Sequence, residues 1–387
     1  DNPMIVEISA YASLVSSGIV GKVQINPRNI LVLKDVDRFF ETNVISIETD
    51  ENRHCVARKI ENYKLKNTLF DGQALADDSI FPKNCNGYIL LRQHFSKMAA
   101  FHSYLQKFFQ DYFGDEYETA TVTDMFGCEH YVKDIKLITT DNAMKWIKFG
   151  KSYDYWCKWV EDCDCMFGIV KTAHESKLGD VQRMSYQMAN SLDEDIMDNV
   201  VEKSVDYITQ LKMDTNVFLD YLKRNANFSN DFEVLVALVE HNPEFERSSY
   251  FRERRRKIIE SYVMNFRSGQ IIQNAENLTI VGSPYAMLLY AATGDESSVD
   301  LDDTFYQEEG TIQCYTERFD SGEYLAFFRS PFNSKNNLTY LHNTYSRKLE
   351  KYFNFGRQII AVNMNGTDFQ SRNNGLIYWP SSRETLF

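Results

Sequence analysis

Several cationic side chains in this sequence follow short apolar segments, where the end of a strand would hold them. Arg92 and Lys97 come after the apolar run 88–91, and Lys136 lies within the alternating run 135–138. Lysine is a flexible point charge and arginine a planar donor of paired hydrogen bonds, so both suit phosphate groups. These residues predict a phosphate-binding site. Lysines scattered over an ordinary surface are the alternative interpretation.

A further candidate for phosphate binding lies in the segment 328–337, which reads FRSPFNSKNN. An apolar strand delivers Arg329 into a turn rich in proline and asparagine, which would fix its guanidinium at a rigid strand end. Arg329 and Asn336 are therefore the nucleotide- or phosphate-binding candidates of this segment. The alternative is a structural turn in which Arg329 pairs with a carboxylate.

The densest run of positive charge is RERRRK at 252–257. Arg252, Arg255 and Arg256 are its candidates for contacts with a nucleic-acid backbone, because lysine and arginine clusters displace the counterions of phosphates. The cations of this run cannot share one face of a helix. An ordinary solvated helix surface is thus the alternative interpretation.

The other motifs do not predict a site. Cys157, Cys163 and Cys165 lie close together but lack the two cysteine pairs that structural zinc sites use. Gly150-Lys151-Ser152 ends like a phosphate-binding loop, yet Lys145 stands where the first glycine of that loop is required.

Composition limits the classes of function. The 387 residues carry 42 Lys and Arg against 55 Asp and Glu, a formal net charge of −13, which excludes a uniformly basic nucleic-acid binder but not a local basic channel. No run approaches 18 apolar residues, so the sequence predicts no membrane-spanning helix. Seven cysteines, an odd number, favour reduced thiols and a cytoplasmic protein. The chain begins at Asp1 rather than at methionine.

The elements that must position these residues can be predicted from their periodicity. Alternation and apolar runs predict strands at 30–33, 44–47, 69–72, 88–92, 119–123, 135–138, 278–282, 311–315, 325–328 and 359–362. Helical spacing predicts a short amphipathic helix over 98–109 and further helices over 197–211, 214–222, 229–239 and 247–266.

This order of elements predicts an α+β fold with two β-barrel-like units linked by a helical region. We expect an N-terminal α/β segment at 1–64, a first barrel-like unit at 65–140, a helical region at 141–268 and a second, incomplete barrel-like unit at 269–387.

The motifs, in this order, resemble the two-barrel (double-psi β-barrel) RNA polymerase superfamily, especially its single-chain phage-type and bacterial members and, distantly, the cellular RNA-dependent RNA polymerases. The segment 69–75 resembles the Asp-Gly turn before the first barrel, and 90–97 resembles the strand that ends in the lysine of that barrel, Lys97. The segments 122–127 and 133–138 resemble the next strands, with Lys136 as a second phosphate-facing lysine. Segments 328–331 and 363–375 resemble the RxP element and the run-up to the metal loop of the second barrel.

The resemblance implies template-directed nucleotidyl transfer from nucleoside triphosphates on an RNA or DNA template. It implies that Lys97 and Lys136 neutralise triphosphate or pyrophosphate charge and that Arg329 holds a phosphate. It also implies Mg²⁺, which the family binds with a D-x-D-x-D loop, but no aspartate follows Gly375 in this sequence. We therefore expect an inactive fragment of such a polymerase, whose full-length form requires Mg²⁺. The alternative is a non-catalytic nucleic-acid-binding or interaction protein.

Overall fold

The computed structural model describes residues 18–83, 85–174, 177–178, 181–183, 196–227, 229–306, 308, 311–328 and 338–364. The chain divides into two compact units, of which the first comprises Asp1–His174, Leu278–Arg329 and Asn333–Phe387. The second comprises Glu175–Asn277 and Ser330–Phe332. Helices and mixed sheets occur together, so the α+β class is confirmed. The double-psi topology within that class remains a prediction.

The first unit contains a seven-stranded sheet with the strand order β1-β11-β6-β7-β5-β10-β2. Its strands are β1 (Gly21–Gln24), β2 (Ile30–Leu33), β5 (Gln73–Asp77), β6 (Tyr88–Gln93), β7 (Ser96–Ser103), β10 (Leu137–Thr140) and β11 (Met166–Thr172). The pairs β5–β7 and β2–β10 are parallel, and the other neighbours are antiparallel. Side chains pack on both faces, which is why the central strands read as continuous apolar runs.

The helix predicted over 98–109 is wrong in its first half. Met98 and Phe101 belong to strand β7, and only α2 (Leu105–Phe113) is helical. Met98 packs in the cluster on one face of the sheet and Phe101 in the cluster on the other. A strand that is buried on both faces loses its two-residue alternation, so its spacing imitated that of a helix.

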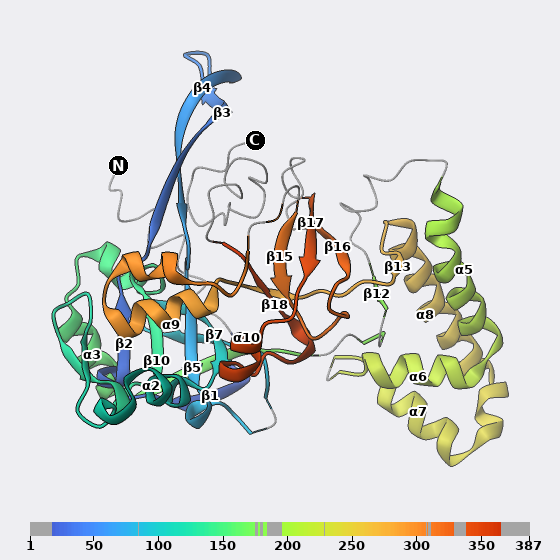
Figure 1. Ribbon diagram of the computed structural model, residues 1–387. Helices are drawn as coiled ribbons and strands as arrows, with labels where there is room; N and C mark the ends of the chain where they lie inside the picture. The colour runs from blue at the N-terminus through green and yellow to red at the C-terminus, as the bar shows by residue number, and fades with distance from the viewer. Residues whose placement is uncertain are drawn as a thin grey trace. The chain divides into compact units, whose positions relative to one another are not determined.

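A second, five-stranded sheet of the first unit has the order β14-β18-β15-β17-β16. Its strands are β14 (Thr279–Gly282), β15 (Ile312–Tyr315), β16 (Tyr324–Phe328), β17 (Leu338–Asn343) and β18 (Ile359–Val362). β14 and β18 are parallel, so their C-terminal ends lie at the same edge (Figure 1). Helix α9 (Pro284–Thr293) follows β14 directly. The sequence patterns did not predict α9, because this helix is apolar on nearly every side.

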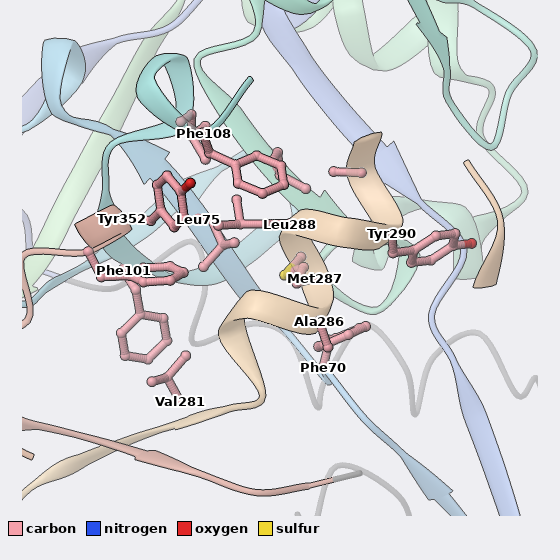
Figure 2. Packing of buried hydrophobic residues seen from close by; sticks show 14 of the residues in the cluster. Phe70, Leu75, Phe101, Phe108, Val281, Ala286, Met287, Leu288, Tyr290 and Tyr352 are labelled. Carbon is pink, nitrogen blue, oxygen red and sulfur yellow. The ribbon is translucent and has the colours of Figure 1, made fainter. Parts of the chain in front are cut away.

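One core joins the two sheets within the first unit. Met287 and Leu288 of α9 lie beside Leu75 and Phe108 of the first sheet and its helix α2 (Figure 2). Gly87, with φ +79°, packs closely against the segment before β18, since a Cβ there would lie 2.9 Å from the carbonyl oxygen of Phe355. The smaller helices of this unit are α3 (Tyr153–Asp162) and α10 (Arg347–Tyr352), and its short hairpin pairs β8 (Thr121–Thr123) with β9 (Glu129–Tyr131).

A long hairpin of β3 (Asp37–Thr49) and β4 (Cys55–Thr68) extends from the first unit (Figure 1). The buried carboxylate of Asp35 fastens its base, accepting hydrogen bonds from the backbone N–H groups of Val36 (2.9 Å) and Phe70 (3.1 Å). The hydroxyl of Thr140 and the amide of Asn142 donate to its other oxygen at 2.8 and 3.0 Å. Burial raises the pKa of Asp35 to about 6 despite these four donors.

The second unit is helical, and the predicted helices of this region are present. They are α5 (Met197–Met213), α6 (Thr215–Asn225), α7 (Phe232–His241) and α8 (Ser249–Arg267), with β12 (Gln182–Arg183) paired to β13 (Ile272–Gln273). The carboxylate of Asp214 caps α6 by accepting from the N–H groups of Asn216 and Val217, as its position in the sequence predicts. Among the described residues, no helix is long and apolar enough to cross a membrane.

Candidate functional site: a cationic end of the first sheet

Three cations lie in one row across the seven-stranded sheet. Lys22 of β1 is paired with Gly168 of β11, Gly168 with Arg92 of β6, and Arg92 with Lys97 of β7. Directly paired residues project their side chains from the same face of a sheet. Adjacent strands are about 4.8 Å apart, so this row places three positive charges within roughly 15 Å.

The guanidinium of Arg92 is only partly exposed and forms no ion pair with an acidic side chain that the structure describes. Its Nη1 donates to the carbonyl of Leu91 at 2.9 Å, while Nε is buried without any hydrogen-bond partner. Burial lowers the pKa of Arg92, because the charged form loses hydration. A half-buried cation without a counter-charge is costly, and an anionic ligand would relieve that cost.

Lys97 faces Arg92 directly across the β6–β7 hairpin. Desolvation and, second, the charge of Arg92 lower the pKa of Lys97, and Asp71 opposes this shift. Lys22, Arg92 and Lys97 form no ion pair with any described carboxylate within 4.0 Å. This cationic row, Lys22–Arg92–Lys97, is therefore a local surplus of positive charge on an acidic chain.

The turn that joins the two central cations is a strained one. His94 and Phe95 both have positive φ, +36° and +58°, a conformation that two-residue hairpins usually give to asparagine or glycine. Aromatic contacts hold it: the His94 ring stacks on Trp159 at 5.3 Å, and the Phe95 ring meets Phe149 edge-on at 5.2 Å. Strain of this kind persists where the surroundings over-determine the backbone, as in many binding sites.

The second sheet reaches the same end of the first sheet. The amide of Gln73 donates to the carbonyl of Gly282 at 3.1 Å and accepts from its N–H at 2.9 Å. Gln73 is paired with Ala99, two residues after Lys97 and on the same face. The residue after Gly282, Ser283, is buried and has a φ of +36°. Its hydroxyl accepts a hydrogen bond from the N–H of Met364 at 2.9 Å. The chain thus leaves β18, through Asn363 and Met364, at the end of the sheet that carries Lys97.

Lys136 lies at the opposite end of the first sheet from Lys97. It immediately precedes β10 and sits opposite Asp77, whereas Lys97 lies level with the residues before Gln73. On β7 the partner of Asp77 is Ser103, six residues after Lys97, so the two levels are about 20 Å apart along the strand. The ammonium of Lys136 is 4.0 Å from the carboxylate of Asp77. The structure therefore does not bring Lys136 to Lys97, contrary to the shared phosphate contact that we expected from the sequence.

The basic run of α8 is largely occupied by contacts within the second unit. Arg255 donates through Nε and Nη2 to the carbonyl of Leu211 at 3.0 and 2.8 Å, at the end of α5. Its guanidinium also lies 5.1 Å from the ring centre of Phe218. Arg256 forms an ion pair with Glu260 at 2.8 Å, and Arg252 is exposed. Arg255 thus has a packing role in the structure, and the nucleic-acid contacts expected of Arg252, Arg255 and Arg256 remain predictions.

The remaining candidates of the sequence lie outside the described residues. These are Arg329, Asn336 and the part of 363–375 that follows Met364. Among the residues that the structure describes, no group of three or more histidine, cysteine or acidic side chains is arranged to hold a metal ion. The segment expected to lead to the Mg²⁺ site follows Met364, so Mg²⁺ binding remains a prediction for the full-length protein.

Sequence reasoning found Arg92 and Lys97 but missed Lys22 and Gln73. Lys22 joins the row only through the pairing of β1 with β11, which lie more than 140 residues apart in sequence, and no local pattern encodes that pairing. Gln73 follows the Asp-Gly turn that the sequence did single out. A buried glutamine at the start of an apolar strand was the available signal, because a buried amide requires a partner.

Comparison with known proteins adds no assignment. No family model matches this sequence, and no curated protein matches it significantly.

Proposed function

We propose that this chain contributes the phosphate-binding part of a nucleotidyl-transfer site, in a template-directed RNA polymerase built on two double-psi-type β-barrels. In this proposal Arg92 and Lys97 bind the phosphates of a nucleoside triphosphate or of the pyrophosphate product. Lys136, Arg329 and Asn336 remain predicted phosphate contacts from the resemblance and are not part of the argument from geometry.

The observation that carries the proposal is the pair of facing cations, Arg92 and Lys97. Two cations face each other across one hairpin, one of them half-buried with an unpartnered Nε, and neither is in an ion pair with a described acid. Such a pair is stabilised when an anion of at least two charges lies between its members. The exit of β18 beside Gln73 and Ser283 supports the same interpretation, because the resemblance expects the catalytic loop to follow that strand.

Binding of ATP and of inorganic pyrophosphate to the chain, measured by isothermal titration calorimetry, tests this proposal. Charge-assisted hydrogen bonds contribute roughly 1.5–3 kcal/mol each, so Arg92→Ala and Lys97→Ala should each weaken binding by about 10- to 100-fold. Arg267→Ala is the matched control, since it removes an exposed cation from the other unit and should leave the affinity unchanged.

Templated incorporation of labelled nucleotide by the full-length protein then separates the polymerase from the alternative, because this chain by itself is expected to be inactive. Incorporation that requires Lys97 supports nucleotidyl transfer. Binding of triphosphate without incorporation favours the non-catalytic nucleic-acid-binding protein. Unchanged affinity in both the Arg92 and Lys97 variants would refute the assignment of this site.

A further inference from the structure

Exposed tyrosines gather on one face of the second sheet. Tyr324 of β16 is paired with His342 of β17, and Tyr340 lies two residues before His342, so the three side chains project from the same face. Leu325 and Leu341 alternate with them along the strands and belong to the hydrophobic cluster on the other face. Tyr324 is 60% exposed and Tyr340 is 65% exposed. We call this surface of Tyr324, Tyr340 and His342 the tyrosine face.

A carboxylate is held in a fixed position beside Tyr324. The side chain of Glu308 accepts hydrogen bonds from Nδ1 of His342 at 2.6 Å and from the hydroxyl of Tyr324 at 3.0 Å. The side-chain amide of Gln313 donates to it at 3.5 Å. A carboxylate offers about four acceptor positions, so Glu308 retains the capacity for a further donor. The hydrogen bond from His342 lowers the pKa of Glu308, which is therefore charged at neutral pH.

The ring of Tyr324 is supported on one side and open on the other. It stacks on the imidazole of His342, with the ring centres 4.5 Å apart and an interplanar angle of 7°. Because Tyr324 is still mostly exposed, its second face is accessible to a flat group from solvent. Such a group would lie next to Glu308, which is bonded to the hydroxyl of the same ring.

The charge of this region selects a cationic occupant. The segment 295–328, which contains Glu308 and β16, has ten acidic residues and one cation, Arg318. Ion pairs with Arg38 and Lys348 occupy two of these acids, Asp300 and Asp303, and most of the negative charge remains. A field of this sign attracts cations and repels phosphates.

We infer that the tyrosine face binds an arginine-bearing basic segment of a partner protein, with a guanidinium stacked on Tyr324 and donating to Glu308. A guanidinium is flat and carries its donors in its own plane, so it stacks on a ring and bonds a carboxylate at the ring edge together. A lysine ammonium is a compact point charge that lacks this flat face. The inference does not depend on the proposed function, which concerns the cationic end of the first sheet.

Fluorescence anisotropy with labelled octa-arginine, octa-lysine and octa-glutamate tests the inference. A cation stacked on an exposed aromatic ring strengthens binding by roughly 2- to 5-fold. We expect the wild type to prefer octa-arginine over octa-lysine by at least that factor and not to bind octa-glutamate. Tyr324→Ala should lose most of this preference, and Tyr324→Phe, which keeps the ring, should retain most of it. Glu308→Gln should weaken the binding of both basic peptides by about 2- to 5-fold.

Tyr131→Ala is the matched control, because Tyr131 is also exposed but has the ammonium of Lys133 at 5.8 Å from its ring centre. It should leave the preference for octa-arginine unchanged. Equal binding of octa-arginine and octa-lysine by the wild type, or a full preference in Tyr324→Ala, would overturn the inference. Self-association of the chain that Tyr324→Ala abolishes, measured by sedimentation, would assign the tyrosine face to a second copy instead. Pyrophosphate binding should be the same in wild type and Tyr324→Ala, which keeps this test separate from that of the phosphate site.

Discussion

Replacing Lys97 by glutamine should make the protein more stable and less able to bind phosphate at the same time. Directly opposite residues on antiparallel strands have Cβ atoms about 5 Å apart, and like charges at such positions destabilise a sheet by up to about 1 kcal/mol. Lys97 is exposed, so water screens part of its repulsion from Arg92. We therefore expect the unfolding free energy of Lys97→Gln to rise by about 0.5–1 kcal/mol in low salt, and by less in high salt.

The assay is urea denaturation of wild type and Lys97→Gln, with and without pyrophosphate, at two ionic strengths. Pyrophosphate should stabilise the wild type, since a ligand that binds only the folded state raises the unfolding free energy. The variant should gain little from it. Lys64→Gln, on the β3–β4 hairpin, is a control that removes one exposed lysine outside the row. A variant that is less stable than wild type yet equally stabilised by pyrophosphate would refute both the repulsion and the site.

Three further outcomes can be checked by denaturation of purified variants. Burial raises the pKa of Asp35 to about 6, above the roughly 3.9 of an unfolded aspartate, so the folded state holds this proton more tightly. Relative to Asp35→Asn, the unfolding free energy of the wild type should fall by about 2 kcal/mol between pH 4 and pH 7. Gly87→Ala should cost roughly 1–3 kcal/mol more than Gly72→Ala, because both glycines have positive φ but only a Cβ at 87 would press on a backbone carbonyl oxygen, that of Phe355 between α10 and β18. Arg255→Ala should cost about 2–3 kcal/mol through its lost bonds to the end of α5, and Arg256→Ala at most about 0.5 kcal/mol; equal costs would contradict the packing role.

The sequence predicted several elements well where one local signal determined them, but the strand predicted at 69–72 is wrong, because these residues form the turn between β4 and β5. Strands 30–33 and 359–362 coincide with β2 and β18, and Asp214 begins α6 as its capping position predicts. It failed where tertiary burial removed the periodicity, as in β7, which read as a helix, and in α9, which is apolar on nearly every side and gave no signal.

The candidate site was predictable only in part, for a related reason. Arg92 and Lys97 are close in sequence, so a hairpin brings them together through local geometry. The position of Lys136 depends on which end of β5 meets β10, and that of Lys22 depends on a pairing with β11. Both positions depend on the pairing of strands that are far apart in sequence, and no local pattern of residues determines that pairing.

The β3–β4 hairpin begins and ends at directly opposed residues, Asp37 and Thr68. The two ends of the hairpin are therefore one strand spacing apart. The hydrogen bonds of Asp35 that hold its base do not depend on the length of the hairpin. We therefore expect the hairpin to tolerate changes in its length. It can be shortened two residues at a time from its tip, between Thr49 and Cys55, without changing which face any remaining side chain occupies. The same geometry makes the tip a natural place to fuse a reporter to this protein.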